Sequence, residues 1–255
     1  HGDTLANPGN IENDKLMKRI ERCFSRGLVD YGLISDDDRI LVGLSGGKDS
    51  LALLELLAKR AQIYKPRFTV IAAHVVMRNI PYQTDVGYLR SFTQSLGGEF
   101  VLYETEFDAS TDTRKSPCFL CSWNRRKALF TIAKEHQCNK IALGHHMDDI
   151  LETLLMNITF QGAFSSMPPK LVMRKFDMTI IRPMCLVHEA DLKQLAVEHA
   201  YKEQLKRCPY EHESHRTSMH GILQQLEAMN PEARYSLWGS MSNIQDELLP
   251  QKNKK

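Results

Sequence analysis

The stretch from Ser45 to Ser50, which reads Ser-Gly-Gly-Lys-Asp-Ser, constrains the fold more than any other part of the chain. It follows an apolar run at residues 40–44 and precedes a second apolar run at residues 51–57. This order predicts a strand, a tight turn and the start of a helix. Adjacent glycines let the backbone approach an anion closely, and the N–H groups at a helix start favour negative charge. The stretch therefore predicts a phosphate site.

Two common phosphate-binding patterns do not fit this stretch. The Walker A pattern needs four residues between its first glycine and its Gly-Lys pair, and then Ser or Thr. Here three residues separate Gly43 from Gly47, and Lys48 is followed by Asp49. The G-x-G-x-x-G dinucleotide pattern is absent as well. A glycine turn without a ligand is the alternative, and the complete string in its strand–turn–helix context makes it the less favoured one.

The remaining sequence alternates between short apolar runs and amphipathic segments. Expected strands lie at residues 39–44, 68–76, 99–104, 140–143 and 179–182, and expected helices at 13–29, 51–57, 83–96, 122–136, 149–160, 189–201, 216–229 and 231–241. This alternation predicts an α/β fold, a parallel sheet with helices on both faces. We expect three segments: an N-terminal helical segment over 1–36, a central α/β domain over 37–186 and a C-terminal helical segment over 187–255.

Ligands of such sheets bind at the carboxyl ends of the strands. This rule predicts that the glycine stretch, His74 and the segment Gly144–Asp149 share one rim. Asp148 and Asp149 stand at an expected helix start, where the helix dipole stabilises carboxylates. Two adjacent carboxylates can hold Mg²⁺ directly or through water. Simple N-capping of the helix is the alternative role.

Composition narrows the class of protein only broadly. The 255 residues are 42% hydrophobic and 25% charged, as in ordinary globular proteins. We expect no membrane span and no signal peptide, because no apolar run approaches the required ~20 residues and the start shows no signal pattern. The net charge of +2 does not by itself indicate a nucleic-acid binder, although Arg125-Arg126-Lys127 forms a local basic group. The spacing of the six cysteines is unlike a secreted disulfide framework, which favours a cytoplasmic location.

Cys118 and Cys121 form a C-x-x-C unit, and Cys208 follows far downstream. A redox disulfide is disfavoured, because no thioredoxin pattern surrounds the unit. Structural zinc would need Cys208 and either His212 or His215 to complete four ligands. An iron–sulfur cluster held by the three cysteines is the third interpretation, and the spacing does not separate it from zinc. The other thiols, Cys23, Cys138 and Cys185, are expected to be buried in the core.

The string Ser45–Ser50 resembles the signature of the PP-loop superfamily of adenine-nucleotide α-hydrolases. Members of that superfamily split ATP between its α- and β-phosphates on a Rossmann-like, HUP-type sheet. The segment Gly144–Thr153 resembles a second ATP-side motif of its tRNA-modifying branch. The C-x-x-C unit with Arg125-Arg126, the tripeptide Ile181-Arg182-Pro183 with Glu189, and Cys208-Pro209 resemble the tRNA 2-thiocytidine synthetase group.

The resemblance implies ATP-dependent tRNA thiolation. ATP would adenylate the C2 oxygen of a cytidine at position 32, releasing pyrophosphate, and sulfur would then replace the oxygen. The implied cofactors are ATP, Mg²⁺ and a [4Fe–4S] cluster held by Cys118, Cys121 and Cys208. These cysteines and Asp49 would be catalytic. The implied ATP-side residues are Ser45, Gly46, Gly47, Lys48, Asp49, Ser50, His74, Gly144, His145, Asp148 and Asp149.

The resemblance also implies partners. These are tRNA, whose phosphates Arg125 and Arg126 would neutralise along with those of ATP, a cysteine desulfurase as sulfur donor, and a second copy of the chain in a homodimer; no membrane is implied. One alternative is another PP-loop tRNA-modifying enzyme, forming 2-thiouridine with structural zinc at the cysteines. The extra cysteine pairs typical of those enzymes are not found here, which counts against it. A non-catalytic, zinc-stapled RNA-binding module is the other alternative, and the intact Asp49, Asp148 and Asp149 argue against it.

Overall fold

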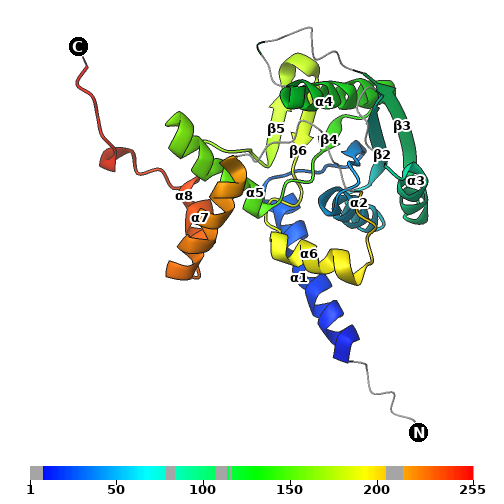
Figure 1. Cartoon of the computed structure of the whole chain (residues 1–255), viewed down its shortest axis with the longest axis horizontal. Helices are drawn as coiled ribbons and strands as arrows, with labels where there is room; N and C mark the ends of the chain where they lie inside the picture. Colours follow the sequence, from blue (N-terminus) through cyan, green and yellow to red (C-terminus); the bar gives the residue numbers. More distant parts are fainter. Residues whose placement is uncertain (1–7, 79–83, 107–113, 115–116, 205–214, 255) are drawn as a thin grey trace. The chain divides into compact units, whose positions relative to one another are not determined.

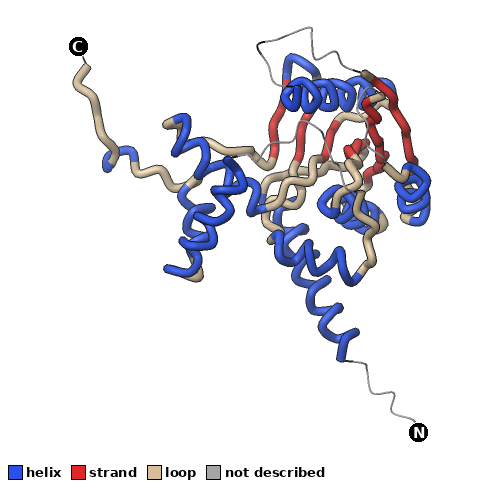
Figure 2. The backbone as a smooth tube through the Cα atoms, in the orientation of Figure 1, coloured by secondary structure: helices blue, strands red, loops and turns tan. Residues whose placement is uncertain are grey.

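The structure is a computed structural model that describes residues 8–78, 84–106, 114, 117–204 and 215–254. Its helices are α1 (Pro8–Asp30), α2 (Lys48–Ala61), α3 (Val86–Ser95), α4 (Pro117–Glu135), α5 (Met147–Met156), α6 (Glu189–Glu198), α7 (His215–Met229) and α8 (Ala233–Ser240). Its strands are β1 (Asp38–Gly43), β2 (Phe68–Met77), β3 (Glu99–Thr105), β4 (Lys140–Ala142), β5 (Lys170–Met173) and β6 (Met178–Ile181). Short helical turns cover Asn157–Gln161, Arg174–Phe176 and Asp246–Leu248. Figure 2 shows how helices and strands are distributed along the backbone.

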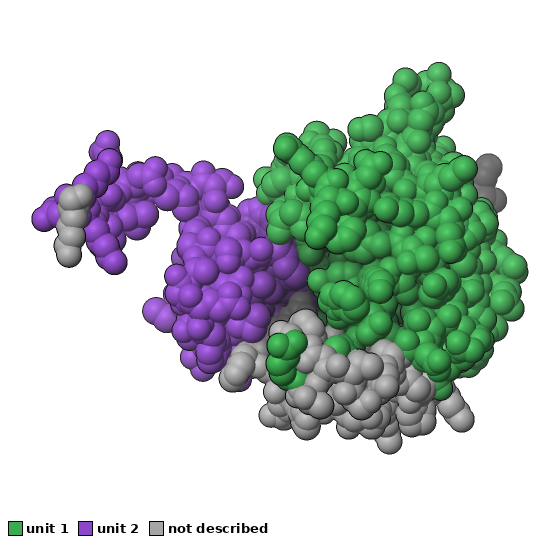
Figure 3. Space-filling view, turned by 90° about the horizontal axis from the view of Figure 1, so that it is seen from above, with its two compact units in different colours: residues 1–147, 168–212 green, residues 148–167, 213–255 purple. Residues whose placement is uncertain are grey.

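The chain divides into two compact units, which Figure 3 shows in different colours. The first unit contains residues 1–147 and 168–212, and the second contains residues 148–167 and 213–255. The first unit therefore holds the whole sheet, and the second holds almost all of α5 together with α7 and α8. The expected division into three segments at residues 36 and 186 stays a prediction from sequence.

The sheet of the first unit has the strand order β3-β2-β1-β4-β6-β5 (Figure 1). The pairs β1–β2, β2–β3, β1–β4 and β4–β6 are parallel, which confirms the expected parallel α/β sheet. β5 pairs antiparallel with β6 at one edge, and the sequence did not predict it. The reason is physical: three of the four β5 residues are exposed, so the strand has no buried apolar run to mark it.

Helices cover both faces of this sheet, and alternate residues of β1 show how the layers form. Ile40 and Val42 belong to a core that includes Leu16 of α1, Leu53 of α2 and Leu192 of α6. The intervening residue, Leu41, belongs to a second core on the side of α4. Because successive strand residues point to opposite faces, β1 is apolar throughout and is buried on both sides. The helices thus form one layer above and one below the sheet.

The order in which strands are added to the sheet changes sides at β1. From β1 it continues to β2 and β3 on one side, whereas β4 and β6 lie on the other side. The carboxyl ends of β1 and β4 therefore flank a topological switch point, where open α/β sheets bind their ligands. The glycine stretch follows β1, and Gly144 follows β4 closely, so both lie at this place.

Two of the helix starts that differ from expectation concern the site residues. α4 begins at Pro117, five residues earlier than expected, because proline suits the first position of a helix. Cys118 and Cys121 therefore lie in the first turn of α4 and not in a loop before it. α5 begins at Met147, which places Asp148 and Asp149 in its first turn. None of the helices in the described ranges is long and apolar enough to traverse a lipid bilayer.

The second unit is held together partly by buried charge. Arg234 of α8 is buried and donates to both carboxylate oxygens of Asp148, at 3.1 and 3.2 Å. It also donates to Glu227 of α7 at 2.7 Å. His220 of α7 lies 2.8 Å from Glu152 of α5. These contacts tie α5 to α7 and α8.

Candidate functional site

The turn between β1 and α2 is shaped by Gly46. Its φ angle of +97° is one that side-chain-bearing residues rarely adopt. The hydroxyl of Ser50 accepts from the N–H of Gly46 at 3.2 Å and donates to the carbonyl of Gly47 at 3.1 Å. The hydroxyl of Ser45 donates to Ser50 at 3.1 Å. Both serines, expected to be donors to a ligand, thus hold the turn itself.

The amino end of α2 carries no side-chain cap. Gly47 is the N-cap residue and has no side chain that could accept from the first N–H groups. These N–H groups and the helix dipole favour an anion at the turn. The glycine turn and α2 thus supply the geometry of a phosphate site.

Lys48 lies between two carboxylates. Its Nζ is 3.1 Å from Oδ1 of Asp49 and 3.5 Å from Oε1 of Glu189, at the start of α6. Burial by itself lowers the pKa of Lys48, but the two carboxylates outweigh it and the pKa rises above its ordinary value. Oδ2 of Asp49 is also 3.6 Å from Nε2 of the buried His146. Glu189 also lies 3.9 Å from Nζ of Lys193, so the turn is bordered by a mixed cluster of acidic and basic side chains.

Gly144, after β4, packs directly against the glycine turn. A Cβ at this position would stand 3.3 Å from the carbonyl carbon of Asp49 and 3.4 Å from the backbone nitrogen of Ser50. Such a contact is tighter than side chains usually make, so glycine permits the close approach. The structure thus brings together two segments that lie about a hundred residues apart in the sequence.

His74 is buried in β2 and supports the entry to the turn. Its Nδ1 lies 2.8 Å from the carbonyl oxygen of Leu44, the residue after β1. A carbonyl can only accept, so Nδ1 carries the proton. Leu44 in turn donates to the carbonyl of Ala73 at 2.8 Å. His74 is 1% exposed, and the register of β1 with β2 puts it level with Leu44, just past the end of β1.

His145 and the two aspartates of the second motif face different surroundings. Nδ1 of His145 accepts from Nε of Arg182 at 3.3 Å, within the first unit. Asp148 belongs to the second unit, where it is buried in the ion pair with Arg234. Asp149 is half-buried in the first turn of α5, where the helix dipole stabilises a carboxylate.

Cys118 and Cys121 are three residues apart and both lie among the first five residues of α4. Their side chains, Cys208 and His212 lie outside the described part of the chain, as does the side chain of His215. Two thiolates on one helical turn and a third from another segment fit the donor set of a three-cysteine cluster. Arg125 and Arg126 follow on the same helix, half-buried and exposed respectively.

The remaining thiols are free, and burial raises the pKa of each. Cys138 and Cys185 are buried, as expected for core thiols, and the pKa of Cys185 rises to about 12. Cys23 is only partly buried, so the expectation was wrong for this residue. It packs against the edge of the core, because larger side chains such as Ile20 and Phe24 fill the fully buried positions of α1.

Gln204 is a site residue that the sequence did not indicate. Its N–H donates to the carbonyl of Gly46 at 2.9 Å, and its side chain accepts from the N–H of Asp85 at 2.6 Å. Lys202 pairs with Asp85 at 2.6 Å and donates its N–H to the hydroxyl of Tyr88. No local pattern marks these residues, because only the return of the chain after α6 brings them to the turn.

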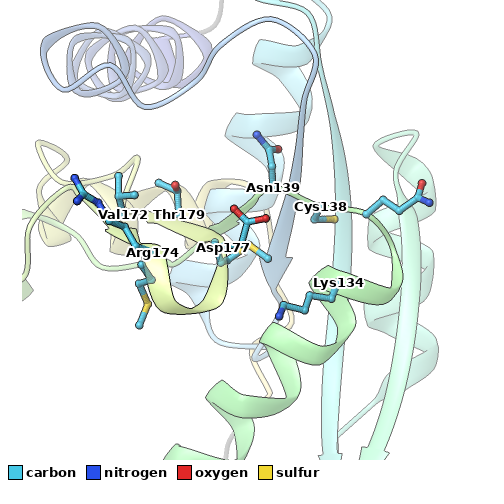
Figure 4. A pocket seen from close by; sticks show the side chains of 10 residues that line it. Lys134, Cys138, Asn139, Val172, Arg174, Asp177 and Thr179 are labelled. Carbon is cyan, nitrogen blue, oxygen red and sulfur yellow. The ribbon is translucent and has the colours of Figure 1, made fainter.

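A cavity of about 660 Å³ lies at the opposite end of the sheet (Figure 4). It opens at the amino ends of β4 and β6, away from the glycine turn, and its lining includes Lys134, Cys138, Asn139, Arg174, Asp177 and Thr179. None of the predicted site residues lines it. The cavity is therefore separate from the candidate site.

Comparison with known proteins agrees with this geometry. Residues 13–205 match the PP-loop domain family. The chain is 36% identical to a tRNA-cytidine(32) 2-sulfurtransferase of Sorangium cellulosum, covering 90% of this chain and 82% of the relative. It is 34% identical to the protein of that name from Geotalea daltonii, covering 91% and 94%.

Among solved structures, the U34-tRNA thiolase NcsA from Methanococcus maripaludis with its [4Fe–4S] cluster is similar, with a TM-score of 0.75 and 27% identity. The match covers 90% of this chain and 80% of that one. The fold, the glycine turn packed on Gly144 and the agreement over most of the length all point to one group. The chain belongs to the tRNA-cytidine(32) 2-sulfurtransferase family of PP-loop proteins.

Proposed function

We propose that this chain is an ATP-dependent tRNA sulfurtransferase that replaces the C2 oxygen of a cytidine, at position 32, with sulfur. The observation that carries the proposal is the packing of Gly144 on the backbone of Asp49 and Ser50. This packing joins two motif segments at the switch point of the sheet. The relatives of the chain are named for this activity, which supports the proposal. The proposed reaction has two chemical steps, adenylation of the oxygen and its replacement by sulfur.

ATP binds at the glycine turn in this proposal. The N–H groups at the uncapped start of α2 receive the phosphates that leave as pyrophosphate. Lys48 carries one positive charge, but Asp49 and Glu189 together carry two negative charges beside it. A triphosphate would bring its own negative charge close to these carboxylates, so we propose that Mg²⁺ enters with ATP and that Asp49 is one of its ligands. Asp148 and Asp149 stay predicted ATP-side residues from the motif alone.

The chemistry requires activation because the C2 oxygen of cytidine is a poor leaving group. In the first step the oxygen attacks the α-phosphorus and pyrophosphate departs, which leaves an O–AMP bond at C2. In the second step a sulfur nucleophile attacks C2, and AMP departs with the oxygen. The glycine turn stabilises the charge that develops on the departing pyrophosphate.

Cys118, Cys121 and Cys208 would hold a [4Fe–4S] cluster. Three thiolates leave one iron of such a cluster without a protein ligand, and when bound the cluster supplies this iron as a carrier of sulfur. Two of these proposed ligands, Cys118 and Cys121, belong to the first five residues of α4. The similarity to a thiolase solved with its [4Fe–4S] cluster supports the cluster over zinc.

The target cytidine must leave its stack to reach the rim of a sheet. Single-stranded loops permit this most easily, so the anticodon loop of tRNA is the natural substrate. Arg125 and Arg126 would contact its phosphates, next to the cysteines on α4. A cysteine desulfurase as sulfur donor, a homodimer and a cytoplasmic location belong to the same proposal.

Anaerobic purification followed by iron, sulfide and zinc analysis tests the metal centre. We expect about four iron and four sulfide ions per chain for a [4Fe–4S] cluster. A colourless protein with stoichiometric zinc would contradict the proposal and would favour the zinc-containing alternatives.

The activity is tested with a tRNA transcript, ATP, Mg²⁺ and sulfide. Nucleoside mass spectrometry should find 2-thiocytidine, and the nucleotide product should be AMP. ADP as product, or sulfur on a uridine, would overturn the assignment. Absence of AMP formation with an intact cluster would instead favour a binding module without catalysis.

A further inference from the structure

Arg182 differs from the other buried lysine and arginine side chains of the described ranges. Lys140, 6% exposed, pairs with Asp38 at 2.6 Å. Arg234, 9% exposed, pairs with Asp148 and Glu227. Arg182 is 7% exposed, and no carboxylate in the described part of the chain pairs with it.

The contacts of Arg182 are all with neutral groups. Its Nε donates to Nδ1 of His145 at 3.3 Å, and its Nη1 donates to the carbonyl of Pro168 at 2.7 Å. Burial, together with the charge of Arg126, lowers the pKa of Arg182 to about 10. The guanidinium therefore keeps its charge at neutral pH. A buried charge without a counter-ion is unfavourable, so an anion is the missing partner.

The position of Arg182 in the sheet indicates which end of the molecule this anion occupies. Arg182 directly follows β6, which pairs with β4, and the N–H of Leu143 donates to the carbonyl of Ile181 at 3.0 Å. Arg182 therefore lies at the same edge of the sheet as the glycine turn after β1. With neighbouring strands ~4.8 Å apart, β6 lies about 10 Å from β1.

His145 adds a second donor to this place. Since Arg182 donates to Nδ1 of His145, that nitrogen carries a lone pair, and the proton of the neutral ring is on Nε2. A guanidinium fork and an imidazole N–H suit the oxygens of a phosphate. The same groups repel a metal cation.

We propose that Arg182, His145 and Arg126 form a second phosphate-binding site at the carboxyl ends of β4 and β6, separate from the glycine turn. The phosphate belongs either to ATP or to the tRNA backbone, and only this choice of source rests on the proposed function. Binding of the phosphate supplies a counter-ion for Arg182, which none of the carboxylates in the described ranges provides.

Equilibrium binding to the full chain tests the site. Dissociation constants for Mg·ATP and for a tRNA transcript are compared between the wild type, Arg182→Gln and Arg182→Lys. We expect Arg182→Gln to weaken one of the two ligands about 10- to 100-fold, as for a charged hydrogen-bond partner, and Arg182→Lys to weaken it less. The ligand affected identifies the source of the phosphate.

Two further variants guard against misfolding and general charge effects. Arg126→Ala changes an exposed side chain and should weaken the same ligand by a smaller factor. Arg174→Gln removes an equally positive, exposed side chain at the opposite end of the sheet and should leave both affinities unchanged. Thermal melting without ligand shows whether each variant is folded.

If Arg182→Gln is folded and binds both ligands within twofold of the wild type, the proposed site is wrong. Should Arg182→Gln not fold, unchanged affinities of Arg126→Ala would overturn it instead. These measurements require neither cluster nor turnover. A chain that binds phosphate through Arg182 but does not thiolate tRNA would therefore contradict the proposed function alone.

Discussion

The N–H of Gln204 donates to the carbonyl oxygen of Gly46 at 2.9 Å, and the side chain of Gln204 fills the space that a Cβ on Gly46 would need. Such a Cβ would stand 2.7 Å from Cβ of Gln204. Cys208 lies only four residues farther along the chain. The glycine turn and the segment that leads to the third cysteine are therefore anchored to each other.

Replacing Gly46 by alanine should disable the glycine turn. The φ angle of +97° penalises any side chain, and the new methyl group must displace either Gln204 or the turn. We expect Gly46→Ala to bind Mg·ATP at least ~10-fold more weakly, from a loss of one or more charge-assisted hydrogen bonds. Isothermal titration calorimetry measures the affinity directly.

Gly97→Ala is the matched control for this substitution. Gly97 also has a positive φ, +77°, but nothing lies within 4 Å of its missing Cβ. The control should lose about 1 kcal/mol of stability from backbone strain and keep its affinity for ATP. Equal ATP affinities of both variants and the wild type would show that the turn does not bind ATP.

Lys48 should stabilise the fold through its two carboxylate neighbours. Lys48→Met leaves Asp49 and Glu189 side by side without their shared cation, so the free energy of unfolding should fall by about 1–3 kcal/mol. The control Lys59→Met, in the same helix as Lys48, removes an exposed ion pair with Glu21 of α1. It should lower the free energy of unfolding by less than about 1 kcal/mol. Urea denaturation at pH 7.5 compares them.

The pH dependence of this contribution has a definite sign. The pKa of Lys48 is raised above its unfolded value of 10.5, so the folded state binds the proton more tightly. The stabilisation is therefore complete below pH 10.5 and is lost as the pH rises through the higher folded value. The stability difference between the wild type and Lys48→Met should be constant from pH 7 to 9.5 and shrink above it. A difference that grows with pH would contradict the pairing.

The thiols outside the cysteine motif should differ in reactivity. Sγ of Cys185 packs against α1, 3.2 Å from where a Cβ on Gly27 would stand, and burial raises its pKa to about 12. At pH 8 it carries almost no thiolate, which is the reactive form. We expect brief iodoacetamide treatment of the native protein to modify the partly exposed Cys23 well before Cys185. Peptide mass spectrometry ranks the sites, and faster labelling of Cys185 would refute its buried position.

Local sequence patterns predicted the central sheet because β1, β2 and β4 contain short, buried apolar runs. The same patterns could not predict β5, whose stability comes from pairing with β6 and not from its own residues. They placed Gly46 and Gly144 at one rim, because both glycines follow strands whose carboxyl ends share one edge of a parallel sheet. They could not predict that Gln204 lies beside Gly46, or that Arg182 has no carboxylate partner among the described residues. Both features depend on contacts between distant segments.

The motif and the structure indicate different roles for Asp148. The sequence motif predicts it on the ATP side, whereas the structure shows its buried carboxylate bound by Arg234 through two hydrogen bonds. Arg234→Met removes that partner from a buried carboxylate. Glu227 also loses this ion-pair partner, but it is partly exposed. We therefore expect the free energy of unfolding to fall by about 2–4 kcal/mol, near the lower end for a broken buried pair.

A double-variant cycle separates the ion pair from a general packing defect. Asp148→Asn in the Arg234→Met background removes the stranded charge, so the double variant should be more stable than Arg234→Met alone by ~1 kcal/mol or more. Chemical denaturation of all four proteins gives the coupling energy. If Asp148→Asn destabilises both backgrounds equally, the two residues are not coupled. Asp148 would then be available for the ATP-side role that its motif predicts.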